Sequence, residues 1–253
     1  MQNRTHFIKS PESRLLLMYP RVKGKTHRLI LVFSALMFLL ACGEKTISPD
    51  DNRLGLEYYP LETGQYRIYD VDEILYSISS FDTLQYQLRE SVVNAFENAE
   101  GTTTYTIHRE KRDNDQANWE LDSVWTARKT STLAISVENN VSLIKMVFPI
   151  NNGLSWDSNK FNQSGEKRFS YDLNVADTTL ANEKLTDLVK VVQSEIEENI
   201  VNRDERYEIF APNIGLIVKH GIRLSFCTVD CPVQKTIESG RFIQQTLFSY
   251  GKE

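Results

Sequence analysis

Apolar and polar residues alternate with a period of two through most of the chain beyond residue 64. Leu84, Tyr86 and Leu88, for example, are separated by polar residues, as in a strand with one face buried. Asn139 and Asn140 lie between two segments rich in β-branched residues and suit the two-residue turn of a hairpin. The pattern predicts about ten strands with short connections.

Two segments could be helical. Residues 177–188 place Leu180, Leu185 and Leu188 at helical spacing, and we expect one short helix there. Residues 189–200 fit either a helix or a strand, and their Val and Ile content favours a strand. The predicted fold class is therefore mainly β, with a single antiparallel sheet. We expect that sheet to be strongly curved or a half-barrel, because either form manages its edges, and to carry one short helix.

A second hairpin is expected near the end of the chain. Pro212 cannot donate a hydrogen bond to a strand ladder, and Asn213 tolerates a positive φ better than most residues. Gly215 follows. These residues predict a connection between two paired strands across 207–219. By contrast, the charged residues 109–118 are expected to form a solvated hairpin tip.

The apolar run Leu29–Leu40 is the longest in the chain and follows four basic residues between 21 and 28. Its twelve residues are too few to span a bilayer comfortably and match the apolar core of a signal peptide. The run ends in Leu39-Leu40-Ala41-Cys42-Gly43, which resembles the lipobox of bacterial lipoproteins. The resemblance implies that Cys42 is acylated and that the chain is cut before it. The alternative is a buried apolar helix that happens to end in a cysteine.

These features divide the chain into four parts. Residues 1–17 fit no signal pattern, so we expect an over-extended upstream segment and a true start at Met18. Residues 18–41 would be the lipoprotein signal peptide, 42–55 a flexible tether rich in polar residues, and 56–253 a β-rich domain.

The composition is that of an ordinary globular protein. Of 253 residues, 41% are hydrophobic and 25% are charged, which argues against a coiled coil, a collagen, a disordered tail or a polytopic membrane protein. Cleavage before Cys42 would remove seven basic residues and one acidic residue, leaving 22 and 33 and a net charge of −11. Such an acidic body disfavours nucleic acid and anionic lipid surfaces as partners, and no basic stripe is visible along the mature chain.

Cys227 and Cys231 remain once Cys42 carries lipid. An even pair in an exported protein predicts a disulfide. A redox pair would usually be spaced C-x-x-C, and a zinc site would need a second pair of ligands nearby. We therefore expect neither a metal nor a cofactor.

Few residues suggest catalysis. His108 and His220 are the two histidines beyond residue 41, and each is expected at or near a strand. The more suggestive residues are Trp119, Trp125 and Trp156, because aromatic side chains on a sheet can stack on sugar rings or line a groove. The alternative, which we favour for them, is that they fill the core.

Three stretches of the chain share motifs with one group of bacterial proteins. They are Tyr59-Pro60-Leu61 with Gly64, Tyr66 and Tyr69; Trp156 after Asn152-Gly153; and Tyr207-Glu208 followed by Ala211-Pro212-Asn213-Ile214-Gly215-Leu216. On these residues the chain resembles uncharacterised lipoproteins of Bacteroidota-type bacteria, over most of residues 58–250. Tyr66 and Asn213 replace a Trp and a Gly that are usual there. The resemblance implies an antiparallel sheet wrapping an apolar face, similar to the half-barrels of periplasmic lipoprotein carriers, and no catalytic residues.

Two functions are compatible with these observations. The first is a non-enzymatic binding or structural module, lipid-anchored to the outer membrane on either its periplasmic or its outer face. Its partner would be an apolar ligand or an envelope protein. The second is a surface lipoprotein that binds or processes glycans, using the Trp side chains and paired acids. Solvent-exposed aromatic residues or two facing carboxylates would favour the second function.

Overall fold

A computed structural model describes residues 51–180, 183–231 and 233–253. The chain divides into two units, Met1–Ser48 and Pro49–Glu253, and all described residues belong to the second unit. After the short helix α2 (Asp51–Leu54) and the 3-10 turn η1 (Leu56–Tyr58), the described elements are strands. They are β1 (Gln65–Ser77), β2 (Ser80–Glu97), β3 (Thr103–Arg112), β4 (Glu120–Lys129), β5 (Leu133–Glu138), β6 (Val141–Val147), β7 (Ser155–Asp157), β8 (Arg168–Asp172), β9 (Thr178–Leu180), β10 (Glu183–Leu185), β11 (Val189–Glu198), β12 (Asn202–Ala211), β13 (Gly215–Phe226) and β14 (Ile237–Lys252).

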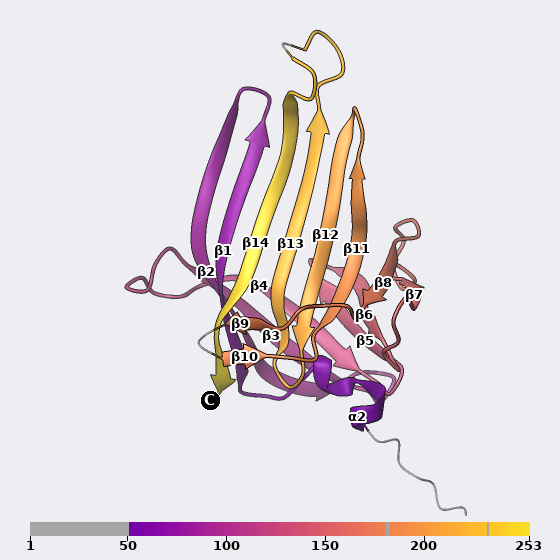
Figure 1. The fold of residues 1–253 in the computed structure, drawn as a ribbon. Helices are drawn as coiled ribbons and strands as arrows, with labels where there is room; N and C mark the ends of the chain where they lie inside the picture. The colour runs from indigo at the N-terminus through magenta and orange to yellow at the C-terminus, as the bar shows by residue number, and fades with distance from the viewer. Residues whose placement is uncertain (1–50, 181–182, 232) are drawn as a thin grey trace, which may run out of the picture. The chain divides into compact units, whose positions relative to one another are not determined.

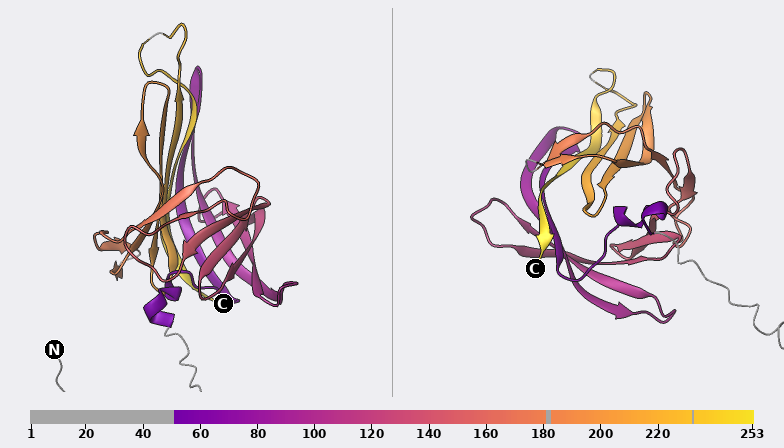
Figure 2. Two further views of the ribbon diagram at one scale, coloured as in Figure 1. Left: turned by 90° about the vertical axis from the view of Figure 1, so that its right-hand side faces the viewer. Right: turned by 60° about the horizontal axis from the view of Figure 1, so that its bottom comes forward.

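One antiparallel sheet contains twelve of these strands, in the order β6-β5-β4-β3-β2-β1-β14-β13-β12-β11-β8-β7. The first and last strands of the chain pair at its middle, and each half continues outward as a meander (Figure 1). The sheet curls until β3–β6 face β11–β13 (Figure 2). Its two edges then meet, since Ile144 of β6 donates its backbone N–H to Ser158 O at 2.9 Å. The predicted fold class, a strongly curved antiparallel sheet, is confirmed.

The alternation of side chains along each strand explains which residues are buried on the curved sheet. In β1, Tyr69 and Val71 are buried while Asp70 and Asp72 are exposed, because successive side chains point to opposite faces. The buried residues form three apolar clusters. Tyr69 also donates its hydroxyl to Leu216 O at 3.1 Å, which ties β1 to β13.

Both predicted turns are confirmed. Asn139 and Asn140 have φ values of 50° and 64° between β5 and β6, as a two-residue turn requires. Asn213 has a φ of 62° and connects β12 to β13. On the two strands that this turn connects, Ile209, Leu216 and Val218 are partly buried against an apolar cluster.

The helix predicted at 177–188 is wrong. Residues 178–180 and 183–185 form the paired strands β9 and β10. Leu180, Leu185 and Leu188 do share one apolar cluster, as their helical spacing suggested. The pairing across the hairpin, with Leu180 opposite Glu183, brings them to that cluster without a helix. Thr178 and Thr179 are β-branched, and this was the signal for a strand.

Candidate functional site

A cleft of about 430 Å³ lies on the inner side of the sheet. Lys219, Gly221 and Arg223 line it from β13, because residues two apart along a strand share a face. Arg241 and Gln245 line it from β14 by the same rule. Its basic side chains number eight, against two acidic ones: Arg109, Lys111, Lys145, Lys167, Arg206, Lys219, Arg223 and Arg241, with Glu138 and Glu208.

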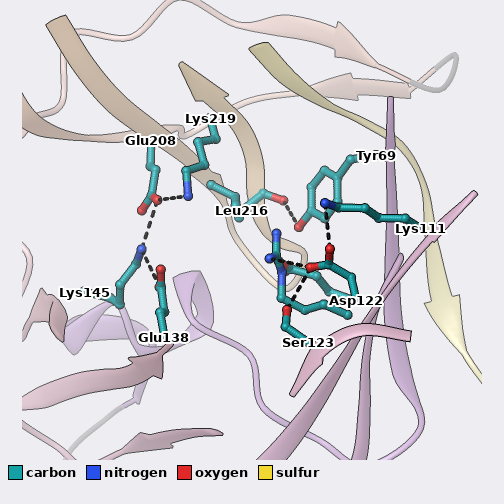
Figure 3. Close-up of polar contacts among 11 residues, drawn as sticks. Tyr69, Lys111, Asp122, Ser123, Glu138, Lys145, Glu208, Leu216 and Lys219 are labelled. Carbon is teal, nitrogen blue, oxygen red and sulfur yellow. Dashed lines mark hydrogen bonds and ion pairs between the residues drawn. The ribbon is translucent and has the colours of Figure 1, made fainter. Parts of the chain in front are cut away.

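The floor of the cleft is a buried ion network centred on Lys145 (Figure 3). Lys145 Nζ lies 3.1 Å from Glu138 Oε1 and 2.9 Å from Glu208 Oε1. Lys219 Nζ lies 3.7 Å from that same Glu208 oxygen. Burial alone would raise the pKa of Glu138, but the charges of Lys145 and Lys219 and the hydrogen bond from Lys145 together outweigh it and lower that pKa. Glu138 and Glu208 thus both lie within ion-pair distance of the same ammonium group.

Three polar atoms beside this network have no hydrogen-bond partner among the described residues. They are Gln245 Nε2, Trp125 Nε1 and Glu208 Oε2. The Gln245 and Glu208 side chains are almost fully buried, at 2% and 1% exposed. These three residues also line a smaller cavity of about 50 Å³ that adjoins the cleft. Arg67 Nε is also unpartnered, and Arg67 lines the smaller cavity. Three donors and one acceptor thus border a space that can hold water or polar ligand groups.

One wall of the cleft comes from β3 and β4. Arg109 lies over the ring of Trp125, 3.8 Å from its centroid, and its Nε is 3.0 Å from Glu90 Oε1. Lys111 lies 2.7 Å from Asp122. Burial would raise the pKa of Asp122, but hydrogen bonds from Lys111 and Ser123 lower it (Figure 3).

The expectation of a solvated tip at 109–118 holds for residues 113–116, which are exposed between β3 and β4, but not for residues 109–112. Strand β3 continues to Arg112, and the side chain of Arg109 is only 14% exposed. A bulge opposite β3 leaves Asp122 without a strand partner, since Arg109 pairs with Ser123 and Glu110 with Leu121. Bulges re-aim side chains in this way, and here Asp122 turns towards the two cations.

The facing wall carries Lys167, Arg206 and Arg223. Arg206 pairs with Asp204, two residues away, at 2.6 Å. No ion pair within the described residues involves Lys167 or Arg223, and Lys167 Nζ lies 5.0 Å from the Phe169 ring centroid. Burial, followed by the positive charges of Arg206 and Arg223, lowers the pKa of Lys167 to about 8. Burial and Arg206 likewise lower the pKa of Arg223.

The three tryptophans singled out in the sequence do not form one surface. Trp125 lines the cleft, with its ring covered by Arg109. Trp156 packs on Tyr171 at 4.6 Å between ring centroids and donates to Ile144 O. The Trp119 ring faces two arginine side chains outside the cleft lining. None of the three is among the exposed large hydrophobic residues.

The other predicted site residues are cysteines. Cys42, the predicted lipidation site, lies outside the described residues. Cys227 and Cys231 are joined in a disulfide in the loop between β13 and β14, with their Cα atoms 5.8 Å apart. Within the described ranges, no group of three or more acidic, His or Cys side chains could hold a metal ion. No helix in those ranges is long and apolar enough to cross a membrane.

Sequence reasoning missed the basic lining because it searched along the chain. Arg206, Lys219, Arg223 and Arg241 lie on three strands and are far apart in sequence, yet the registers of β12, β13 and β14 bring them together. The available signal was the alternation within each strand. Lys219, Gly221 and Arg223 are spaced two apart, as are residues that share one face of a strand.

Comparisons with known proteins give two structural likenesses. No family model matches the chain, and no curated protein matches it. One solved structure is a provisionally described exported protein with a YmcC-like fold from Bacteroides fragilis. It is 14% identical, with a TM-score of 0.42, and the match covers 77% of this chain and 99% of that one. Another is a provisionally described lipoprotein from Parabacteroides distasonis, at 9% identity and a TM-score of 0.40, covering 77% and 98%.

Proposed function

We propose that this protein is a lipid-anchored binding module of the outer envelope that holds a polar ligand in the cleft of its curved sheet. The observation that carries the proposal is the set of unpartnered atoms at the cleft floor, Gln245 Nε2, Trp125 Nε1 and Glu208 Oε2. A buried polar group without a partner costs stability, on the order of 1–3 kcal/mol. Such costs are typical of sites where a ligand supplies the missing contacts.

The charged lining favours a polar ligand over an apolar one. Eight basic and two acidic side chains border the cleft, and an apolar ligand would bury them without compensation. The apolar clusters are instead filled by the protein's own side chains. The size of the cleft, about 430 Å³, suits a small molecule or one or two sugar units of a larger one.

Binding fits the site better than glycoside hydrolysis does. That reaction requires a carboxylic acid that is protonated near neutral pH beside a second, ionised carboxylate. Glu138 and Glu208 are the two acids facing each other in the cleft, but both contact Lys145. The pKa of Glu138 is lowered, so it stays ionised and offers no proton.

Glycan binding is a second candidate because the cleft floor has both an unpartnered donor and an unpartnered acceptor. Sugar hydroxyls both donate and accept hydrogen bonds, so the hydroxyls of one sugar could donate to Glu208 Oε2 and accept from Gln245 Nε2. Stacking of a sugar on Trp125 is disfavoured, because Arg109 covers that ring at 3.8 Å. A glycan would therefore be held by polar contacts rather than by an aromatic platform.

The test is native mass spectrometry of the full-length protein, released from its own envelope in a mild detergent. We expect a bound polar compound on the wild type that is lost in Gln245→Leu, which removes the unpartnered amide with little change of volume. Gln244→Leu is the matched control, because Gln244 contacts His220 Nδ1 on the opposite face of the same strand. It should retain the compound.

Either of two results would contradict the proposal: no bound compound on any form, or equal retention by Gln245→Leu. A stability measurement separates binding from folding. If the Gln245 amide awaits a ligand, its replacement by Leu should leave the free protein as stable as the wild type or more stable, by up to about 1 kcal/mol. A purely structural amide would instead give a loss of stability.

A further inference from the structure

We propose that the ligand of the cleft carries a phosphate, sulfate or carboxylate group, and that Lys167, Arg206 and Arg223 hold this group. The proposal rests on the function proposed above and names the chemistry of its ligand. The three side chains belong to separate parts of the fold, namely the residue preceding β8, strand β12 and strand β13, and all three line the cleft.

The backbone holds these three residues in place. The N–H of Lys167 donates to Asp157 Oδ1 at 2.9 Å, and its carbonyl accepts from the N–H of Ser158 at 2.8 Å. Arg206 lies directly opposite Gly221 in the β12–β13 register. Because Gly221 has no side chain, Ile243 and Arg206 can both approach its backbone: a Cβ there would lie 3.1 Å from Ile243 Cγ2 and 3.7 Å from Arg206 Cγ.

Lys167, Arg206 and Arg223 differ from the other basic residues of the cleft in how many carboxylates lie near them. Lys145, Lys219, Arg109, Lys111 and Arg241 each have a carboxylate within 4.0 Å. For Lys167 and Arg223, no such carboxylate is found among the described residues. Asp204 is the acid paired with Arg206. The facing wall therefore holds three cations for one carboxylate.

An excess of basic over acidic side chains is unusual for this chain. Residues 1–50 contain eight basic and three acidic residues, so residues 51–253 contain 21 basic and 31 acidic ones. An acidic domain that places eight of its 21 basic side chains around one cleft focuses positive potential there. Arg223 lies opposite Arg241 in the β13–β14 register and opposite Asp204 in the β12–β13 register. The like-charged pair is destabilising, and Asp204 offsets part of that repulsion.

The lowered pKa of Lys167 agrees with its position beside Arg206 and Arg223 in the protein without a ligand. The pKa of Lys167 falls to about 8 through burial and through the charges of Arg206 and Arg223. An anion between the three would remove this mutual repulsion and form charge-assisted hydrogen bonds, which are the stronger kind. Arginine contributes a planar pair of donors suited to a phosphate or a carboxylate.

The same group could come from a soluble compound or from a lipid head group, and two probes distinguish these sources. The full-length protein in a neutral detergent is titrated calorimetrically with sodium tripolyphosphate. A second titration uses dihexanoyl phosphatidylglycerol, with dihexanoyl phosphatidylcholine as its zwitterionic control. Binding of tripolyphosphate indicates a soluble anion, whereas binding of the phosphatidylglycerol alone indicates a head group.

The variants Lys167→Gln and Arg223→Gln test the residues. Each should weaken binding of the anionic probe about tenfold, as expected for loss of one charge-assisted contact. The matched control is Arg168→Gln, because Arg168 neighbours Lys167 in sequence but is 70% exposed and pairs with Glu166. It should bind like the wild type. Raised salt should weaken wild-type binding more than that of either cleft variant.

A second measurement separates ligand binding from a structural role. In the absence of any anion, Arg223→Gln should raise the melting temperature, because it removes repulsion from Arg206 and Arg241. The proposal is overturned if neither anionic probe binds the wild type, or if the cleft variants bind as tightly as Arg168→Gln does. If neither anionic probe binds but the natural compound is still lost in Gln245→Leu, the cleft binds a neutral ligand. That result contradicts the anion proposal and leaves the proposed binding function in place.

Discussion

Lys167 is a cation placed among cations. Arg206 and Arg223 act on it from β12 and β13 and Lys145 from β6, while Glu208 offsets part of their charge. Natural proteins accept such locally unfavourable arrangements mainly where a ligand or a reaction requires them. The basic residues that lower the stability of the unliganded protein are therefore the same residues that we propose to bind the ligand.

The low pKa of Lys167 gives a pH prediction. Its folded-state pKa, about 8, lies below the value of about 10.4 for an unperturbed lysine. Between these two values the unfolded chain binds more protons than the folded one, so the stability contributed by Lys167 increases as pH rises through 8. Chemical denaturation of the wild type and Lys167→Met should show this increase between pH 8 and about 9.5 in the wild type alone.

A direct titration checks the same residue. Lys167 labelled by ¹³C reductive methylation should titrate near pH 8 by NMR, well below the other lysines, and its pKa should increase when tripolyphosphate is added. Arg168→Gln serves as a control in both measurements, because it leaves the surroundings of Lys167 in place. A Lys167 pKa near 10 in the free protein would contradict the crowding of charges described for the cleft wall.

At the scale of single elements, the β12–β13 hairpin depends on Gly215. Its φ is +89°, in the left-handed region that favours glycine. A Cβ at this position would lie 2.9 Å from Arg67 Nη1 and 3.2 Å from Pro60 Cδ. Arg67 itself donates to Ile214 O at 3.1 Å. The turn therefore fits against β1 and the segment before it only when residue 215 has no side chain.

We expect Gly215→Val to lower the free energy of unfolding by about 1–3 kcal/mol, through backbone strain and the lost fit. Gly153→Val is the matched control, since Gly153 has a φ of +73° but no heavy atom within 4 Å of a Cβ. Gly153→Val should lower the free energy of unfolding by less than Gly215→Val does. The difference between the two losses measures the effect of the contact with Arg67 and Pro60, and urea unfolding of both variants gives it. Equal losses would show that strain alone matters.

The disulfide belongs to the loop between β13 and β14. Only three residues separate Cys227 from Cys231, so the bond should stabilise the fold by no more than about 2 kcal/mol. We expect thiol labelling of the denatured, unreduced protein to modify neither cysteine. The double variant Cys227→Ser, Cys231→Ser should melt a few degrees lower and keep its fold. Modification of both cysteines in the wild type would rule out the bond.

Individual elements were predictable where local rules decide them. The Asn139–Asn140 turn and the strand at 189–198 follow from turn chemistry and β-branched residues. The segment 177–188 was mistaken for a helix because three leucines at helical spacing also meet in a hairpin. The bulge at Asp122 was not predictable either, since it depends on how β4 fits the curvature of β3.

At the scale of the whole molecule, the fold could be predicted and the site could not. Alternation along the chain specifies strands with a buried face, and short connections specify an antiparallel order. A cleft, however, is made across strands. Arg206 and Arg241 belong to strands separated by β13, and no scan along the sequence places them near Lys167. The apparent absence of a basic stripe was a consequence of searching in one dimension.

The distribution of charge bears on how the protein reaches a membrane. Residues 51–253 carry a net charge of −10 in the sequence, while the positive side chains concentrate in the cleft. A net negative domain is repelled by anionic lipid head groups. The proposed attachment would then come from acyl chains, and stable anchoring requires more than one of them. The lipobox-like segment ending in Cys42 is the feature of the sequence that predicts such chains.

We therefore expect Cys42→Ser to abolish acylation and membrane anchoring. Wild-type cells fed an alkyne-tagged fatty acid should yield labelled protein that partitions into the detergent phase, and the variant should be unlabelled. Because the uncleaved apolar run Leu29–Leu40 could itself retain the variant, a second form should begin at Gly43 behind a cleavable secretory signal. That form should be soluble. Cys227→Ser, which keeps Cys42, is the control and should stay labelled. Label on Cys42→Ser, or membrane partitioning of the form that begins at Gly43, would contradict the anchor.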